Sequence, residues 1–273
     1  MCAIATQDAM FHRPLVTDIP AIPLAQLPKA LRAFCQRPLA DRREYLQSRY
    51  RVAFDGYSYP GQEDSCNQGP QDQLHSFVFS DFSPREHYPL ELQAFIRCRW
   101  AVLCRQVQAL EQAILQDLGL AAIARQHRRH FGHMMSANYY PPPDQPGAGT
   151  PGLRLSAHPD VSLLTVFIQG LGPGFQYRDT DGAWRDAPLV PRVTVFAGEL
   201  LEWLTNGAIP ALQHRVRAQA GGDERFSFAL FSLPRPGAVV ARPGGASITT
   251  EDWYRLHLNQ WDAAYNHQEM SRP

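Results

Sequence analysis

Three residues in the second half of the chain have the types and spacing of metal ligands. His158 and Asp160 are separated only by Pro159, and His214 follows 54 positions after the aspartate. In an extended strand, residues i and i+2 point to the same face, so this imidazole and this carboxylate can bind one ion together. A third ligand from a distant part of the chain leaves the opposite positions of the ion open, which is the arrangement used in non-haem Fe(II) chemistry. A His-x-Asp pair alone arises often by chance, so the surrounding sequence has to support the assignment.

The motifs around these residues occur in a recognisable order. They are Asn138-Tyr139-Tyr140-Pro141-Pro142, Gly174-Phe175-Gln176-Tyr177, Gly198-Glu199-Leu200, Thr205-Asn206-Gly207, Gln213-His214-Arg215-Val216 and Arg225-Phe226-Ser227-Phe228. Together with the His-Pro-Asp segment, this set resembles the Fe(II)/2-oxoglutarate-dependent dioxygenases of the isopenicillin N synthase-like superfamily. The resemblance is close over residues 138–234 and weaker toward both ends.

The resemblance implies a set of cofactors and the residues that hold them. Fe(II) would be bound by His158, Asp160 and His214, and O2 would be the oxidant. The distal carboxylate of 2-oxoglutarate would be bound by Arg225 and Ser227, because a guanidinium forms a planar, charge-assisted clamp for a carboxylate. The matching motif positions also place Tyr140 and Asn138 at the co-substrate. Related halogenases have a small residue in place of the carboxylate ligand, so the aspartate argues against halogenation. The alternative for the triad is a buried, hydrogen-bonded histidine beside an aspartate at the end of a strand.

Residues that contact the substrate are less clearly marked. By position, five side chains are candidates to face the metal, with core packing as an equal alternative: Met135, Arg154, Leu164, Phe175 and Phe231. His130 and His133 also lie two residues apart, but they match nothing in the family pattern. We interpret these two histidines as structural or pocket-lining.

Composition limits the partners and the compartment. The 273 residues include 26 Lys plus Arg and 26 Asp plus Glu, so no overall charge attracts nucleic acid. No apolar run approaches the ~18 residues that a membrane span needs. The five cysteines form no Cys-x-x-Cys pair, which favours reduced thiols and a cytoplasmic location. We therefore expect a small-molecule substrate, with no nucleic acid and no membrane. The oligomeric state cannot be read from the sequence.

Short strands separated by proline and glycine dominate the chain after residue 130. The predicted strands are 131–139, 153–158, 162–169, 174–178, 183–186, 192–197, 214–219 and 225–232, with an earlier strand at 75–79. Such a pattern predicts a mainly β fold with flanking α-helices, and the architecture we expect is a double-stranded β-helix (jelly roll).

Two helices are predicted around this core. Apolar residues spaced three and four apart predict a long bracing helix over 91–118, which Gly119 ends. Thr249 begins a C-terminal helix that carries Trp253 and Trp261 and that we interpret as a lid. We expect a single domain, in which residues 1–130 pack on a catalytic core of 131–235 and 236–273 form the lid segment.

The remaining segments are predicted to be less regular. We expect a short opening strand within 17–28, a charged helix near 39–50 and a surface loop with short extended pieces at 54–73. A proline-rich connection follows at 141–151, and the basic residues 125–130 are predicted to form a solvated connection. The Asn-His-Gly segment common in the family is missing.

The resemblance implies an oxygenase that acts on small molecules. Hydroxylation, desaturation or cyclisation of the substrate would accompany conversion of 2-oxoglutarate to succinate and CO2, and the expected context is specialised metabolite biosynthesis. Two alternatives remain open. One is an iron oxidase of the same fold that does not use 2-oxoglutarate, and the other is a non-catalytic binding module.

Overall fold

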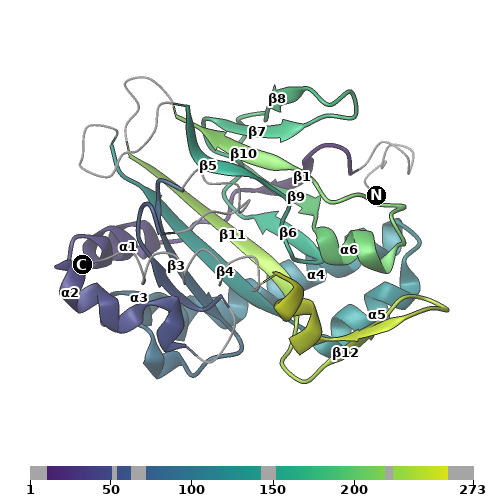
Figure 1. The fold of residues 1–273 in the computed structure, drawn as a ribbon, viewed down its shortest axis with the longest axis horizontal. Coiled ribbons are helices and arrows are strands. Elements are labelled where there is room, and N and C mark those ends of the chain that lie inside the picture. Colours follow the sequence, from purple (N-terminus) through teal and green to yellow (C-terminus); the bar gives the residue numbers. More distant parts are fainter. Residues whose placement is uncertain (1–10, 51–53, 63–71, 143–151, 219–223, 258–273) are drawn as a thin grey trace.

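Two antiparallel sheets form the centre of the protein. The computed structural model describes residues 11–50, 54–62, 72–142, 152–218 and 224–257. The large sheet has the strand order β1-β9-β6-β11-β4-β3-β2, and the smaller sheet has the order β5-β10-β7-β8 (Figure 1). A short hairpin, β12-β13, stands apart from both sheets. The two sheets form the jelly-roll core that the sequence predicted.

The strands and helices have the following bounds. The large sheet contains β1 (Leu15–Pro20), β2 (Gly56–Ser58), β3 (His75–Ser80), β4 (Phe131–Tyr140), β6 (Leu164–Phe167), β9 (Arg192–Ala197) and β11 (Arg225–Pro234). The smaller sheet contains β5 (Leu153–His158), β7 (Phe175–Arg178), β8 (Trp184–Asp186) and β10 (His214–Arg217), and the hairpin contains β12 (Val239–Ala241) and β13 (Ser247–Thr249). The helices are α1 (Leu27–Cys35), α2 (Leu39–Arg42), α3 (Leu90–Phe95), α4 (Ala101–Asp117), α5 (Ala121–His130) and α6 (Glu199–Leu204). A further helix occupies residues 250–257.

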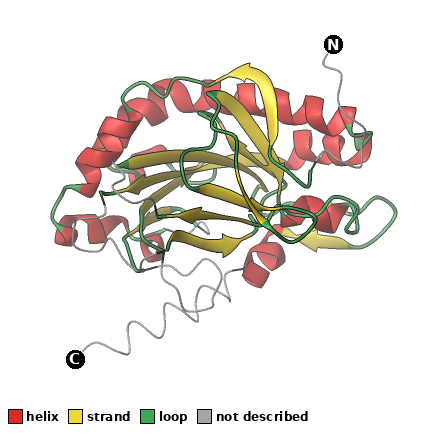
Figure 2. Cartoon of the chain, turned by 90° about the horizontal axis from the view of Figure 1, so that it is seen from above, coloured by secondary structure: helices red, strands yellow, loops and turns green. Residues whose placement is uncertain are grey.

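Two apolar clusters form the core of the described structure, and the larger one lies mainly on the outer face of the large sheet. The larger cluster joins this face to the long helices, which lie along one side of the strands in Figure 2. On β4 this face carries the odd-numbered residues, among them Met135 and Ala137, which are fully buried. The second cluster joins the facing sides of the two sheets, with Tyr140 and Phe196 from the large sheet and Phe175 from the smaller one. The alternation along each strand therefore decides which residues can reach the space between the sheets.

The predicted regular elements are largely confirmed. The strands at 153–158 and 192–197 have the predicted bounds, and the other predicted strands begin and end within a few residues of those in the structure. The bracing helix is continuous through α3, a π-helical turn at Ile96–Trp100 and α4. Thr249 caps the C-terminal helix: its Oγ1 accepts a hydrogen bond from the backbone N–H of Asp252 at 3.1 Å. Trp261 and the proline-rich stretch 143–151 lie outside the described residues.

Four expectations need correction. The opening strand is Leu15–Pro20, and it belongs to the large sheet through pairing with β9. The helix near 39–50 is broken into α2 and two 3-10 turns, Arg43–Tyr45 and Gln47–Arg49. Phe54 to Ser58 are buried rather than a surface loop, because β2 pairs with β3. The basic segment is α5, whose Ile123, Ala124 and His127 are buried against the core. Pairing and packing partners that are distant in sequence decided each case.

No helix in the described part of the chain is long and apolar enough to cross a membrane.

Candidate active site

The three expected metal ligands lie together at one end of the jelly roll. His158 is the last residue of β5 and His214 is the first of β10, and the two are register partners in the smaller sheet. Asp160 lies in the turn after β5, whereas the two-residue spacing predicted a position on the strand. Its Oδ1 is 3.8 Å from Nε2 of His158 and 3.8 Å from Nε2 of His214. The pairing of β5 with β10 thus brings together groups that are far apart in the sequence.

Hydrogen bonds to backbone carbonyls orient the rings of His158 and His214 relative to Asp160. Nδ1 of His158 is 2.7 Å from the carbonyl oxygen of Ser156, and Nδ1 of His214 is 3.2 Å from that of Leu212. A carbonyl only accepts, so each Nδ1 carries a proton, and Nε2 is the nitrogen that each ring turns toward Asp160. Burial lowers the pKa of His214 to about 4, so this ring is neutral at neutral pH. Nε2 of each ring and Oδ1 of the aspartate lie too far apart for a hydrogen bond, and these three atoms are the donor types that bind a divalent cation.

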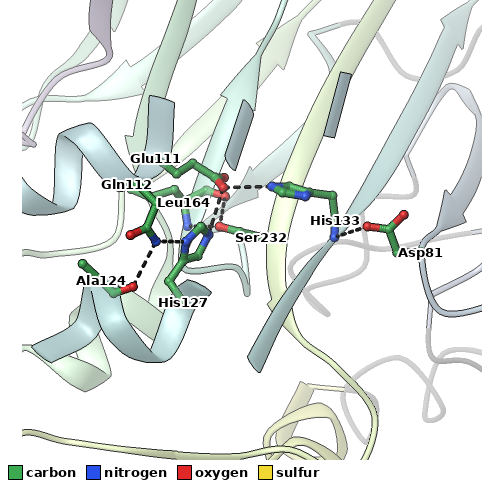
Figure 3. A network of polar contacts seen from close by, with 8 residues as sticks. All are labelled: Asp81, Glu111, Gln112, Ala124, His127, His133, Leu164 and Ser232. Atoms are coloured by element: carbon green, nitrogen blue, oxygen red, sulfur yellow. Dashed lines mark hydrogen bonds and ion pairs between the residues drawn. The ribbon is translucent and has the colours of Figure 1, made fainter. Parts of the chain in front are cut away.

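A second group of two histidines and a carboxylate shows the opposite arrangement (Figure 3). Glu111 of α4, His127 of α5 and His133 of β4 are all buried. Oε2 of Glu111 is 2.9 Å from Nε2 of His127 and 2.8 Å from Nε2 of His133. Gln112 donates to the carbonyl of Ala124 at 3.0 Å, which orients its amide N–H toward Nδ1 of His127. His127 therefore accepts at Nδ1 and donates from Nε2 to the glutamate.

Protons rather than an ion join this second group. Both distances, 2.9 and 2.8 Å, are those of ordinary hydrogen bonds from a ring N–H to one carboxylate oxygen. Burial opposes the charge of Glu111, but the two imidazoles outweigh it and hold the pKa of the carboxyl below its ordinary value. The group links α4, α5 and β4 on the face of β4 turned away from the space between the sheets. His133 therefore has a structural role, one of the two interpretations offered by the sequence.

A third possible ligand group, Asp81 with Cys104 and His133, shares its histidine with the second. Burial, reinforced by the nearby carboxylates of Asp81 and Glu111, raises the pKa of the Cys104 thiol. A thiol that stays protonated is a poor metal ligand. Among the described residues, His158, Asp160 and His214 are thus the group best suited to a metal ion.

The other end of the same cavity carries an arginine with no partner in the described part of the fold. No described residue accepts a hydrogen bond from Nε, Nη1 or Nη2 of Arg225, although all three nitrogens are buried. The guanidinium carbon lies 4.6 Å from the ring centre of Tyr140. A Cβ atom on Gly172 would come within 2.8 Å of Nε of Arg225, so this glycine makes room for the side chain. A buried guanidinium of this kind calls for an anion, and a carboxylate of 2-oxoglutarate fits it.

The expected co-substrate residues surround this arginine. Ser227 follows two residues later on β11, and Asn138 and Tyr140 lie on the neighbouring β4. Tyr140 is the register partner of Arg225, and Asn138 is the register partner of Ser227. All four side chains line the cavity that also contains the metal-ligand group. The cavity has a volume of about 170 Å³.

Two of the five substrate candidates, Phe175 and Phe231, line this cavity. Met135 does not, because the odd-numbered residues of β4 face the helices, and Met134 lines the cavity in its place. Leu164 is packed in the cluster on the helix side of the large sheet, whereas Phe167 reaches the cavity from the same strand. The predictions for Met135 and Leu164 as cavity residues were therefore wrong by strand alternation.

Arg154 is also turned away from the cavity lining. Its Nη2 donates to the carbonyl of Pro141 at 2.5 Å, and its guanidinium carbon lies 5.6 Å from the ring of Tyr140. The prediction that it faces the metal was wrong, because backbone carbonyls bind its side chain. It supports the strand end that carries Tyr140.

Two cavity residues had no role assigned from the sequence. His257 of the C-terminal helix lies with Nε2 2.9 Å from Oε2 of Glu199, at the start of α6. Nδ1 of His257 lies 2.8 Å from the carbonyl oxygen of Trp253, and Trp253 donates from Nε1 to the carbonyl of Val161 at 3.0 Å. Burial opposes the charge of His257, but its bond to Glu199 raises its pKa overall. In the sequence, Trp253 and His257 lie four residues apart on a helix that Thr249 caps. This spacing was the signal that could have identified His257.

Comparison with known proteins agrees with this geometry. Residues 131–234 match the model of the 2OG-Fe(II) oxygenase superfamily. Leucoanthocyanidin dioxygenase of Malus domestica is 25% identical over 237 residues, which are 82% of this chain and 64% of that protein. The corresponding Petunia hybrida protein is 25% identical over 236 residues, 79% of this chain and 51% of its own length. A 2-oxoglutarate-dependent dioxygenase of Arabidopsis thaliana, AOP3, is 37% identical over 92 residues, 33% of this chain and 22% of that protein.

Solved structures share the fold at lower identity. A Neurospora crassa protein in complex with alpha-KG and thymine has a TM-score of 0.68 at 20% identity and covers 93% of this chain and 91% of its own. JOX2, in complex with 2OG, Fe and JA, has a TM-score of 0.70 at 18% identity and covers 92% of this chain and 79% of its own. Residues 131–234 of this chain thus match the 2OG-Fe(II) oxygenase superfamily, and the solved structures share its fold. Its cofactors, Fe(II) and 2-oxoglutarate, are those expected from the sequence.

Proposed function

We propose that this protein is an Fe(II)- and 2-oxoglutarate-dependent oxygenase that oxidises a small molecule in specialised metabolite biosynthesis. The chain spans 64% and 51% of the length of the two leucoanthocyanidin dioxygenases it matches, so the activity of the whole protein is part of this proposal. One observation carries it: a His-His-Asp group with metal-ligand geometry and a buried arginine without a hydrogen-bond partner among the described residues line the same cavity.

The residues have separate roles in this proposal. His158, Asp160 and His214 would hold Fe(II), which with 2-oxoglutarate and O2 supplies oxidation of a C–H bond and yields succinate and CO2. Arg225 and Ser227 bind the carboxylate of the co-substrate and so fix its orientation in the cavity. The guanidinium of Arg225 lies over the ring of Tyr140. Asn138 lines the cavity beside the co-substrate. Asp160 and His214 are buried, and a low exposure to solvent strengthens their electrostatic interactions.

The lining supports a small, largely apolar substrate. Phe175, Phe231 and Phe54 contribute aromatic surface to the cavity. Val78 and Met134 add further apolar surface. The relatives' names include an ortho-hydroxylase of coumaroyl CoA and feruloyl CoA from Ipomoea batatas, whose acyl groups are aromatic. Hydroxylation, desaturation and cyclisation all fit this lining. The C-terminal helix, through His257, would cover the cavity as a lid. The location we propose is the cytoplasm, where reducing conditions preserve ferrous iron and free thiols.

An anaerobic titration tests the proposal. Fe(II) and then 2-oxoglutarate are added to the apoprotein, and the visible charge-transfer absorption of the chelate is recorded. Wild type develops the band, whereas His158→Ala and Asp160→Ala do not, and neither forms substrate-dependent succinate. His87→Ala, which changes an exposed histidine, serves as the control and behaves as wild type. Iron binding without the band would instead favour a 2-oxoglutarate-independent oxidase. Absence of iron binding would favour a non-catalytic binding module.

A further inference from the structure

The two carboxylate oxygens of Asp160 have different surroundings. Oδ1 faces Nε2 of both His158 and His214 at 3.8 Å. Oδ2 accepts a hydrogen bond from Oγ1 of Thr165 at 2.6 Å. Thr165 lies on β6 and is fully buried. The hydrogen bond from Thr165 therefore holds the carboxylate through Oδ2, and Oδ1 faces the two imidazoles.

A second hydroxyl fixes the direction of this hydrogen bond. Oγ of Ser162, which is also fully buried, is 2.9 Å from Oγ1 of Thr165. A hydroxyl has one proton, and Thr165 gives its proton to the carboxylate, which only accepts when ionised. Ser162 must therefore donate to Thr165. A donated bond polarises the threonine hydroxyl and strengthens its own bond to Asp160.

The backbone of the turn is held as firmly as the side chains. The N–H groups of Glu199 and Leu200 donate to the carbonyls of Asp160 and Ser162, at 2.7 and 3.1 Å. A Cβ atom on Gly198 would lie 2.2 Å from the carbonyl oxygen of Ser162, so only glycine permits this close approach of α6. The aspartate and the two hydroxyls therefore sit on a backbone that has little freedom to shift.

We propose that Thr165 is a positioning residue that reserves Oδ2 of Asp160, so that the carboxylate binds the metal through Oδ1 alone. The inference rests on the proposed function. Carboxylates bind metals through one or both oxygens. Three protein atoms leave open positions on the ion, and a second carboxylate oxygen would compete with 2-oxoglutarate or O2 for one of them. Ser162 supports Thr165 from behind and has the smaller effect.

Four variants separate this role from ordinary packing. Thr165→Val removes the hydroxyl at nearly constant shape, and Thr165→Ser restores it. Ser162→Ala removes only the supporting donor. Thr194→Val is the matched control, because Thr194 is a buried threonine on the neighbouring β9 whose Oγ1 donates to the carbonyl of Arg192 at 3.2 Å. Thermal unfolding of each apoprotein shows that the variants are folded.

The readouts are metal affinity and the visible spectrum of the Co(II)-loaded protein, both without turnover. Thr165→Val is expected to bind Fe(II) and Co(II) about 10- to 100-fold more weakly and to shift the Co(II) bands. Thr165→Ser and Thr194→Val should match wild type, and Ser162→Ala should lie between wild type and Thr165→Val. Should Thr165→Val not fold, an intermediate loss of affinity in Ser162→Ala carries the proposal, and its absence overturns it.

The outcomes distinguish this inference from the proposed function. Wild-type affinity and an unchanged Co(II) spectrum in Thr165→Val would overturn the positioning role while leaving the metal site intact. An equal defect in Thr165→Ser would likewise overturn it, because the hydroxyl would then not be the cause. If wild type binds neither Fe(II) nor Co(II), the proposed function fails, and this inference fails with it.

Discussion

Replacement of Arg225 by methionine separates ligand recognition from folding. The side chain keeps similar length and loses only its charge and its donors. Because no described residue accepts a hydrogen bond from this guanidinium, the variant should not lower the melting temperature of the apoprotein. Its affinity for 2-oxoglutarate should fall sharply.

The size of the loss follows from the burial of the three nitrogens. Removing one partner of a buried, hydrogen-bonded charge pair costs about 2–5 kcal/mol in binding. At about 1.4 kcal/mol per factor of ten, this corresponds to a roughly 30- to 4,000-fold increase in Kd. Ser227→Ala removes one neutral donor and should cost only about 0.5–1.5 kcal/mol.

Thermal unfolding in the presence of Mn(II), with and without 2-oxoglutarate, is the assay, followed by anaerobic calorimetry. Arg154→Met is the matched control, since Arg154 also lies over the ring of Tyr140 but donates to the carbonyl of Pro141. It should lower the apoprotein's stability by about 1–3 kcal/mol, because a buried carbonyl loses its donor. It should retain most of the stabilisation by 2-oxoglutarate.

The reasoning would be refuted by the reverse pattern. If Arg225→Met destabilises the apoprotein as much as Arg154→Met and still responds fully to 2-oxoglutarate, Arg225 is part of the fold and not a ligand clamp.

Two further predictions concern stability. Glu111→Gln should destabilise the protein by about 3–5 kcal/mol in chemical denaturation, because it leaves two buried imidazoles without their carboxylate. In the wild type, the contribution of Glu111 to the free energy of unfolding should decrease as pH falls below about 4.5, since the folded-state pKa of Glu111 is depressed. An unchanged unfolding free energy would contradict the structural role of this group. Burial raises the pKa of Asp55 from 3.8 to about 6, so its folded state holds the proton more tightly than the unfolded state. Its contribution is therefore fully present below pH 3.8 and is lost as pH rises through about 6, by about 3 kcal/mol in total. Asp55→Asn should remove this loss, which is seen by comparing the unfolding free energies of the two proteins from pH 4 to 7; parallel curves would count against it.

Local patterns were sufficient for much of the fold. The spacing of apolar residues predicted the bracing helix, because the periodicity of a long amphipathic helix repeats over many turns. The strands were recognised because proline and glycine mark their ends in the sequence. The broken helix near 39–50 pairs with β2 through Leu46 and Tyr57, and β2 is buried because it pairs with β3; no local pattern records these contacts.

Strand alternation was the main source of error at the candidate site. Asn138 and Tyr140 share a face of β4, so Met135 could not lie on that face, and Met134 does. Family motifs placed Asn138 and Tyr140, whereas Met135 was proposed by position without a motif of its own. A strict two-residue period counted back from Asn138 selects Met134, so the sequence did contain the correct choice.

The sequence by itself determined which groups are available to do chemistry: two histidines, an aspartate and an Arg-x-Ser pair, in the order of a known family. Only the tertiary structure decided what those groups face. Carbonyls two residues before each histidine fix the protons on Nδ1, and pairing of β5 with β10 directs both Nε2 atoms at Asp160. In the Glu111 group, the amide of Gln112 donates to Nδ1 of His127, so the proton of that ring lies on Nε2 and is donated to Glu111. The same residue types therefore form a hydrogen-bonded link there. The physical reason is that residue type sets the number of donors and acceptors, whereas the partners that fix their protons come from elsewhere in the fold.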